Sequence, residues 1–340
     1  MSKTLSTSTR SAKYQIITRT AEFVSPGHPD KMCDILSDYI LDLYLEKDPL
    51  SRVAVEVMGG HGELNVCGEI TSTARIDVEK ALRKRIRDGM KLRINVVEQS
   101  PEIARGVDEG GAGDQGVMVG YACAENDQLL PTEYVLARDL CKKIYAAHPY
   151  DGKTQITVAL KYGSSRQFIS AEIQHVVASW QKVSSQEIAS EIVDWTNNLP
   201  QKISVSDKLK ISINPAGDWD LGGFDADTGL TGRKIVIDNY GPRVPVGGGA
   251  FSGKDPSKVD RSAAYMARQI AKDYLLDRHA NEVLVFLAYA LGEKAPVDAT
   301  VMIDGESEKV KNYDLSPQGI IDRLGLLEPH YEQRAKWGHF

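Results

Sequence analysis

Long apolar runs, a secretion signal and an excess of positive charge are all missing from this sequence of 340 residues. The longest uninterrupted apolar run, residues 283–291, has nine members, whereas a membrane-spanning helix needs roughly 18. The first eleven residues are rich in serine and threonine and have no apolar core, which excludes a secretory signal. We therefore expect a soluble protein without a membrane partner, whose residues 1–13 form a flexible tail.

The sequence also has no surplus of basic residues and no cysteines at the spacing of a metal site. Lys and Arg number 41 against 47 Asp and Glu, a net charge of −6, so no basic surplus exists for a nucleic-acid partner. The four cysteines form no CxxC pair and have no histidine at ligand spacing, which argues against a zinc site or a disulfide framework. A reducing, cytoplasmic location is expected. Each cysteine is interpreted as a small buried apolar residue: Cys33, Cys67, Cys123 and Cys141.

Hydrophobic periodicity indicates one order of elements three times, a helix, a hairpin, a second helix and a strand, with no closing strand identified in the third set. The predicted elements are helix 30–46, hairpin 52–57 with 64–70, helix 77–88 and strand 93–97; helix 132–147, hairpin 154–162 with 167–178, helix 185–197 and strand 210–213; and helix 258–276, strands 282–291 and 298–303, and helix 316–324. This repeat predicts an α+β protein of three similar domains, 14–120, 121–222 and 223–340, each laying helices on one face of a mainly antiparallel sheet. A doubly wound parallel sheet is disfavoured because helices and single strands do not alternate.

Two glycine-rich stretches, 106–120 and 214–260, show too little periodicity for regular structure, and loops of that length usually carry function. GAGDQG at 111–116 fits GxGxxG, but no strand runs directly into it, so a Rossmann site is excluded. GGAFSGK at 248–254 fits GxxxxGK, but Asp255 stands where a P-loop needs a hydroxyl. What remains is a set of glycine N–H groups with lysines nearby, a pattern that favours phosphate.

Charged residues gather beside these glycines. The stretch 247–261 contains three cations and two acids, and Arg233-Lys234 lies upstream; the five are Lys254, Asp255, Lys258, Asp260 and Arg261. Such a mixture suits a polyphosphate with Mg²⁺, which takes one or two carboxylates plus phosphate oxygens. A solvated charged face is the alternative interpretation.

SPGHPDK at 25–31 places His28, Asp30 and Lys31 at the start of the first predicted helix. Free backbone N–H groups at a helix start favour anions. The alternative is that Asp30 merely caps the helix.

Four segments together resemble S-adenosylmethionine synthetase (methionine adenosyltransferase): GHPDK at 27–31, GAGDQG at 111–116, GLTGRK at 229–234 and GGGAFSGKDPSKVDR at 247–261. The resemblance implies three similar α+β domains about a pseudo-threefold axis, in agreement with the repeat described above. It also implies that the methionine sulfur attacks C5′ of ATP, and that the released tripolyphosphate is then hydrolysed to phosphate and diphosphate.

The resemblance further implies roles for individual residues. The implied catalytic residues are His28, beside the bridging oxygen of the triphosphate, and Lys153, Lys254 and Lys258. The implied ATP-binding residues are His28, Asp114, Asp151, Lys153, Trp219, Arg233, Lys234, Ala250 and Lys254. The implied methionine-binding residues are Glu69, Gln99, Asp227, Lys258 and Leu291. Two Mg²⁺ ions per site are implied at Asp30 and Asp260, and K⁺ at Glu56.

The resemblance also implies a homodimer with shared active sites, with a dimer of dimers as the larger assembly, and a gating loop at 99–109. Glu56 and Glu69 have a plainer interpretation as outward strand residues, and Leu291 as ordinary core. Asp218 replaces a basic residue of the family's pattern, so negative charge is expected near the nucleotide.

Two other functions stay open. A polyphosphate or nucleotide hydrolase would keep the phosphate half of the site without the methionine residues Glu69, Gln99 and Asp227. A catalytically silent regulatory relative would have lost His28, Lys153 or the lysines of the last motif. All of these residues are present.

Overall fold

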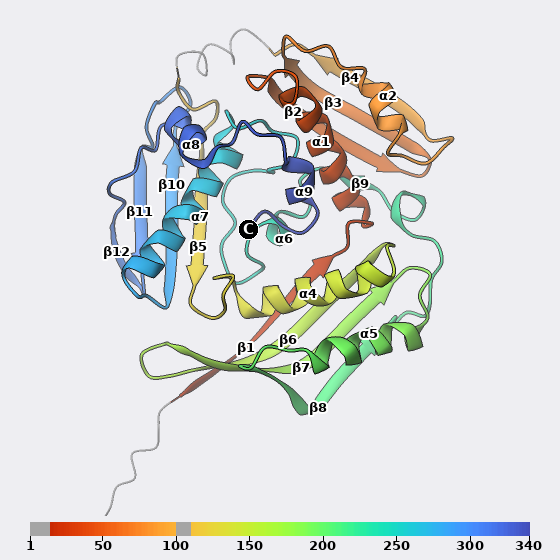
Figure 1. The fold of residues 1–340 in the computed structure, drawn as a ribbon, viewed down its shortest axis with the longest axis vertical. Helices are drawn as coiled ribbons and strands as arrows, with labels where there is room; N and C mark the ends of the chain where they lie inside the picture. The colour runs from red at the N-terminus through yellow and green to blue at the C-terminus, as the bar shows by residue number, and fades with distance from the viewer. Residues whose placement is uncertain (1–13, 100–109) are drawn as a thin grey trace, which may run out of the picture.

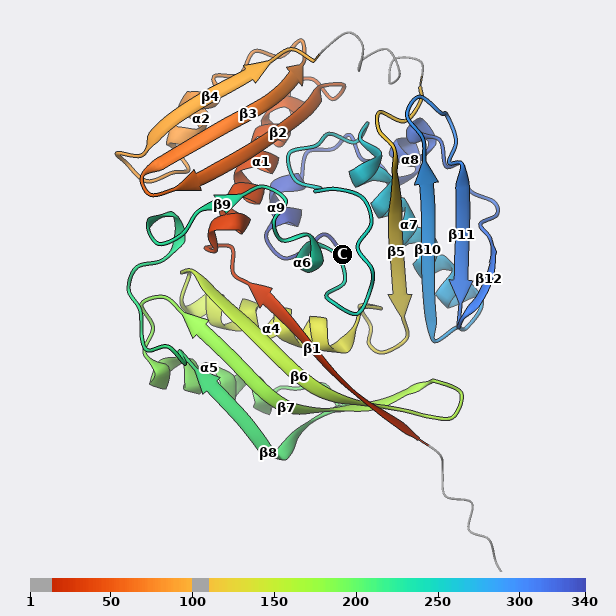
Figure 2. The same cartoon turned by 180° about the vertical axis from the view of Figure 1, so that it is seen from behind.

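Three sheet-and-helix units surround a common centre in the computed structural model, which describes residues 14–99 and 110–340. Helices α1, α4 and α7 lie on the inner side and the sheets on the outer side (Figure 1, Figure 2). The α+β prediction with three similar units is confirmed. The predicted tail 1–13 and all of the predicted gate except Gln99 lie outside the described residues. Nowhere in the two described ranges is a helix both long and apolar enough to cross a membrane.

The first sheet has the strand order β4-β3-β2-β9. Side chains along β2 alternate between buried and more accessible positions, and the buried ones, Val53, Val55 and Val57, belong to the same core as α1. β4 pairs with β3 in parallel, because α2 crosses between them. The elements are α1 (Pro29–Leu45), β2 (Arg52–Gly60), β3 (Glu63–Thr71), α2 (Val78–Arg83), β4 (Lys91–Val97) and β9 (Gly229–Leu230).

The second sheet has the order β1-β6-β7-β8 and carries α4 and α5. A capping box begins α5, in which Ser184 and Glu187 satisfy each other's backbone N–H groups. The elements are β1 (Gln15–Val24), α4 (Thr132–Ala147), β6 (Gly152–Tyr162), β7 (Phe168–Trp180), α5 (Ser185–Asn197) and β8 (Ile203–Ile213).

The third sheet, of order β12-β11-β10-β5, packs on α7 and is antiparallel throughout. A Cβ added at Gly120 would lie 2.0 Å from the Ala267 carbonyl oxygen, so glycine lets β5 approach α7 closely. The elements are β5 (Gly116–Cys123), α7 (Val259–Asp277), β10 (Glu282–Tyr289), β11 (Asp298–Ile303), β12 (Glu306–Lys309), α8 (Pro317–Leu324) and α9 (Tyr331–Ala335).

Each sheet takes one strand from elsewhere in the chain: β1 joins β6, β5 joins β10, and β9 joins β2. The sequence patterns missed these three strands. The prediction that 106–120 and 214–260 lack regular structure is also wrong. β5 begins in the first stretch, and the second contains β9, the 3₁₀ turn η1 (Gly223–Asp225) and α6 (Ile235–Asp238). Their pairing partners are distant in sequence, so no local hairpin signal exists. The ranges 14–120, 121–222 and 223–340 remain our proposed domain limits, with strands exchanged between them.

The end of the described chain fills the centre (Figure 1). Phe340 stacks on Tyr240 with ring centroids 4.7 Å apart, and Trp337 packs against Phe23 of β1. The sequence patterns gave no signal for this segment, because its few apolar residues show no period.

Two smaller predictions are wrong. The helix expected at 77–88 ends at Arg83, with Lys84 as its C-cap, and the chain then turns through the left-handed Gly89, at φ 83°, before β4. Cys67 is exposed on β3, while the other three cysteines are buried; all four are unpaired in the described residues.

Candidate active site

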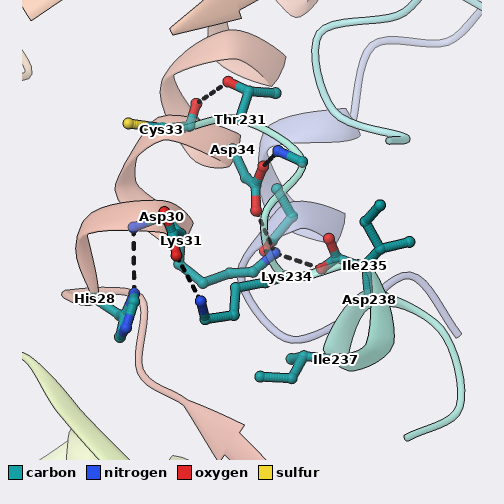
Figure 3. A network of polar contacts seen from close by, with 12 residues as sticks. His28, Asp30, Lys31, Cys33, Asp34, Thr231, Lys234, Ile235, Ile237 and Asp238 are labelled. Carbon is teal, nitrogen blue, oxygen red and sulfur yellow. Dashed lines mark hydrogen bonds and ion pairs between the residues drawn. The ribbon is translucent and has the colours of Figure 1, made fainter. Parts of the chain in front are cut away.

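His28 occupies the N-cap of α1, and Pro29 follows at the first helical position. Its Nδ1 accepts a hydrogen bond from the backbone N–H of Asp30 at 3.2 Å (Figure 3), so the neutral ring carries its proton on Nε2. Burial and the charge of Lys234 lower the pKa of His28 to about 4. At neutral pH His28 is therefore an uncharged N–H donor. The alternative that Asp30 merely caps the helix is wrong.

Asp30 joins α1 to the turn 229–234. Its carboxylate accepts from Lys234 Nζ at 2.5 Å and from the Leu230 backbone N–H at 2.9 Å (Figure 3). Arg233 Nε lies 3.5 Å away. Burial alone would raise the pKa of Asp30, but the hydrogen bonds from Lys234 and Leu230 and the charges of Lys234 and Arg233 together lower it. Two motifs that are far apart in sequence thus meet here.

Close backbone approach requires glycine on both sides of this turn. A Cβ at Gly229 would lie 2.1 Å from the Pro29 carbonyl oxygen, and one at Gly232, where φ is 79°, would lie 2.5 Å from Ala250 Cβ. The turn is therefore held between the start of α1 and the loop 247–254.

The loop 247–254 folds back onto the start of α7. Asp260, in the first turn of α7, accepts from the Gly249 N–H at 2.7 Å and from Lys254 Nζ at 2.6 Å. Lys258 Nζ donates to Asp255 at 2.5 Å. Both lysines are thus paired with carboxylates and keep part of their side chains exposed.

Arg261, which the sequence groups with the phosphate-binding cations, faces the interior instead. Its side chain is fully buried and donates to both carboxylate oxygens of Asp38, at 2.7 and 2.8 Å. On α7, Arg261 lies toward α1, so it contributes to packing and does not reach the surface.

Further residues near His28 come from the central unit and from the stretch 219–227. Asp151 accepts from the Gly223 N–H at 2.9 Å, and a Cβ at Gly222 would lie 2.8 Å from the Trp219 ring. The charges of Lys153 and Asp227 both act on the pKa of His28. The structure therefore gathers one set of predicted residues, here called the His28 group: His28, Asp30, Asp151, Lys153, Trp219, Asp227, Arg233 and Lys234.

Comparison with known proteins gives the same family along the described chain. Models of the N-terminal, central and C-terminal domains of S-adenosylmethionine synthetase match residues 16–97, 109–219 and 221–340. The chain belongs to the S-adenosylmethionine synthetase family. It is 39% identical to the S-adenosylmethionine synthases of Petrotoga mobilis and Nocardia farcinica and 40% identical to that of Salinibacter ruber, with 94% of this chain and 92% of each relative covered. The resemblance drawn from the four motifs is confirmed.

The residues that the resemblance assigns to methionine or to K⁺ do not all join the His28 group. Glu56 and Glu69 are exposed on the outer face of the first sheet, as their plainer interpretation predicts. Ala54 pairs with Glu69 on one side and bridges to Lys254 on the other, which puts Lys254 and Glu69 about 10 Å apart along one row. We call Glu56 and Glu69 the outer-face pair.

Gln99 starts the predicted gate. Its backbone N–H donates to Thr71 Oγ1 at 3.3 Å, and its side-chain Oε1 is buried without a hydrogen-bond partner among the described residues. A buried acceptor without a donor marks a place where a ligand or another segment belongs.

Asp114 and Leu291 lie in two loops that contact each other. Ala112 exchanges backbone hydrogen bonds with Gly292 and Glu293, at 2.8 and 2.9 Å, so the loop 111–116 lies against the turn after β10. Leu291 is 63% exposed, and its interpretation as ordinary core is wrong.

The donor set for metals is sparse. Within the described residues, no three His, Cys, Asp or Glu side chains are grouped to hold an ion. Asp30 and Asp260 each offer one carboxylate, which fits Mg²⁺ only where phosphate oxygens complete its shell. Glu56 offers one exposed carboxylate for K⁺.

Asp218 is engaged in a local turn. Its exposed carboxylate accepts from Asn214 Nδ2 at 2.8 Å and from Ser185 Oγ at 3.0 Å, and these hydrogen bonds lower its pKa. Its expected effect on the nucleotide stays a prediction.

The sequence patterns missed two buried carboxylates of α1, Asp34 and Asp38, and Asp238 of α6. A signal for the first two was present, because aspartate recurs at every fourth position from Asp30.

Proposed function

We propose that the protein transfers the adenosyl group of ATP to the sulfur of L-methionine. The reaction consumes ATP, methionine and water and yields S-adenosylmethionine, phosphate and diphosphate, with tripolyphosphate as the intermediate. The observation that supports it best is the His28 group, in which a neutral imidazole, three cations and three carboxylates from three separate segments meet.

The chemistry that this arrangement allows is displacement at C5′ with a polyphosphate as the leaving group. The sulfur–C5′ bond forms as the bond from C5′ to the bridging oxygen breaks, and its electron pair stays on that oxygen. The Nε2–H of His28 donates a hydrogen bond to the developing charge, and Lys153, Arg233 and Lys234 neutralise the phosphates. Donors fixed in advance at such an oxygen are worth roughly 10²–10³ in rate.

Metal ions are part of the proposal. Asp30 and Asp260 would each hold one of two Mg²⁺ ions together with phosphate oxygens, and Glu56 would hold K⁺. Bound Mg²⁺ would supply further charge neutralisation on the polyphosphate.

One assay tests the reaction. Purified protein is incubated with ATP, methionine, Mg²⁺ and K⁺, and S-adenosylmethionine is separated from the phosphates by chromatography. We expect S-adenosylmethionine and phosphate to form together. Phosphate without S-adenosylmethionine would show a polyphosphate or nucleotide hydrolase, and no product would show a silent relative; either result contradicts the proposal.

We further propose a homodimer with shared sites, or a dimer of dimers. Glu56 and Glu69 are exposed on the outer face of the first sheet, and that face also exposes Met58 and Val97. If a site takes the His28 group from one chain and the outer-face pair from its partner, two inactive variants will complement each other.

Complementation makes the shared site testable. His28→Ala and Glu69→Gln are co-expressed with different tags, and mixed dimers are isolated. Each mixed dimer then has one site with both groups intact, so activity should return. The matched control combines His28→Ala with Lys153→Ala, both in the His28 group, and should stay inactive. No recovery in the first pair, or light scattering that shows an active monomer, would contradict the proposal.

A cytoplasmic location belongs to the same proposal. The four cysteines are unpaired in the described residues, as a reducing compartment favours. Cell fractionation with antibody detection tests it.

A further inference from the structure

One face of α1 carries an aspartate at every fourth position, and each accepts backbone N–H groups from outside the helix: Asp30 and Asp34 from the turn 229–234, Asp38 from the loop 247–254 and Asp42 from the start of α9. Because four residues make about one helical turn, these side chains form a single row. Asp30 accepts from Leu230 at 2.9 Å, Asp34 from Gly232 at 2.8 Å, Asp38 from Gly253 at 2.8 Å, and Asp42 from Tyr331 and Glu332 at 3.0 and 2.9 Å.

Asp34 binds the turn that carries two of the proposed phosphate-binding cations. Its Oδ1 receives the N–H of Gly232, the residue immediately before Arg233. Gly232 is fixed from the other side by Ala250, since a Cβ there would lie only 2.5 Å from Ala250 Cβ. The hydrogen bond to Asp34 therefore sets the direction in which the chain leaves toward Lys234.

The surroundings of Asp34 are charged and fully enclosed. Lys31 Nζ lies 2.9 Å from Asp34 Oδ2, contacts Asp238, and donates to the Ala335 carbonyl oxygen at 2.9 Å (Figure 3). Lys31 and Asp34 have no exposed side-chain surface, so substrate does not reach either. Lys31 thus donates hydrogen bonds to Asp238 and Ala335 and forms an ion pair with Asp34.

We propose that Asp34 is a positioning residue: it holds the turn 229–234 so that Arg233 and Lys234 are already placed before phosphate binds. This inference rests on the proposed function for its link to phosphate. The turn is ordered when the protein folds, so phosphate binding loses less conformational entropy. Asp34 acts through the backbone of Gly232 and touches no substrate.

Removing the Asp34 carboxylate should leave a foldable protein. Lys31 keeps Asp238 and Ala335 as partners, so its buried charge stays paired. The like charge of Asp34 is one cause that raises the pKa of Asp238, after burial, and Asp34→Ala removes this repulsion.

Three variants separate positioning from general stability. Asp34→Ala removes the acceptor for Gly232. Asp34→Asn keeps an oxygen for that N–H, although its amide faces the Lys31 ammonium and should lower the thermal midpoint. Asp42→Ala is the matched control. It removes a carboxylate on the same helix face that accepts two backbone N–H groups, but these belong to the start of α9 and not to the turn 229–234.

Two measurements are made on each variant without any turnover. The first is amide hydrogen exchange of peptides that cover 229–234 in the ligand-free protein, and the second is calorimetric binding of tripolyphosphate. We expect Asp34→Ala to exchange faster in this peptide and to bind tripolyphosphate more weakly by between about 10- and 100-fold. Asp34→Asn and Asp42→Ala should match the wild type in both.

The outcomes distinguish the two proposals. Unchanged exchange at 229–234 in Asp34→Ala overturns the positioning role, as does an equal loss of tripolyphosphate affinity in Asp42→Ala. A wild-type protein that binds neither ATP nor tripolyphosphate overturns the proposed function, while the exchange measurement still decides whether Asp34 orders the turn.

Discussion

The Lys254 ammonium lies 2.6 Å from a carboxylate oxygen of Asp260, and Lys234 pairs in the same way with Asp30 at 2.5 Å. Both carboxylates proposed for Mg²⁺ are therefore held by lysines that are also proposed to bind phosphate. A polyphosphate that attracts the lysines frees the carboxylates for the metal, so the two ligands should help each other to bind.

We predict that Mg²⁺ binds weakly to the protein alone and roughly 5- to 150-fold more tightly when tripolyphosphate is present, the usual range of coupling between ligands. Calorimetric titration of Mg²⁺ with and without tripolyphosphate measures this coupling, after correction for Mg²⁺ bound by free tripolyphosphate. Equal affinities in the two titrations would contradict the exchange of partners.

His28→Ala should abolish the formation of S-adenosylmethionine and largely spare hydrolysis of added tripolyphosphate. The reason is that His28 is proposed to act at the bridging oxygen that leaves C5′, a bond that is absent from tripolyphosphate. Parallel assays of the two reactions check it. An equal loss of both activities would place His28 in general phosphate binding.

The ring of His28 should stay neutral through the physiological range. Burial and Lys234 lower its pKa to about 4, so the unfolded chain binds a proton more readily between pH 4 and the ordinary value of 6.5. His28 therefore contributes stability that is fully present above pH 6.5 and is lost as the pH falls toward 4. NMR titration of the metal-free protein should show its ring signals moving only near pH 4. A midpoint near 6.5 would contradict the burial of this ring.

Gly232→Ala should disrupt the site more than the same substitution at Gly89, a glycine with a similar φ. At Gly232 the left-handed φ of 79° and the contact with Ala250 act together, whereas Gly89 has a φ of 83° with nothing near its Cβ position. Gly89→Ala should cost only the backbone strain, about 1–2 kcal/mol, with an unchanged KM for ATP. Gly232→Ala should lose more stability and raise that KM. Equal effects of the two substitutions in thermal unfolding and kinetics would exclude the close contact.

Arg243→Met should destabilise the protein by about 3–5 kcal/mol, because it leaves the buried carboxylates of Glu125 and Glu133 without their shared cation. Burial would raise the pKa of Glu125, but Arg243 outweighs it and the pKa is lowered. In the variant, burial should raise the folded-state pKa of Glu125 above its ordinary value of 4.5, whereas the pKa in the wild type lies below 4.5. The stability deficit should therefore be full at neutral pH and shrink as the pH falls from the raised pKa of the variant to the lowered pKa of the wild type. Urea unfolding at several pH values measures it. Arg278→Met, which breaks an exposed pair with Glu308, should change stability by no more than about 0.5 kcal/mol.

Local sequence patterns predicted the longer helices, the hairpins and the repeat of three units. Helices α4 and α5 have the predicted bounds, 132–147 and 185–197, because an amphipathic period is a local property of the chain, and the capping box of α5 is local as well. The motifs with His28, Arg233-Lys234 and Lys254 were equally visible, since glycines and charges at fixed spacing need no knowledge of the fold.

Which of these residues meet depends on how the three units pack together. Strands β1, β5 and β9 pair with partners that are distant in sequence, and no local period encodes such pairing. Likewise, Arg261 stands among the proposed phosphate-binding lysines in sequence, yet its side chain is buried against Asp38. Its position on α7 faces α1, and the sequence pattern does not show that these two helices pack together. Asp34 has the same residue type as Asp30 and lies one turn away, but its enclosure by Lys31, Asp238 and Gly232 makes it part of the framework that holds the site.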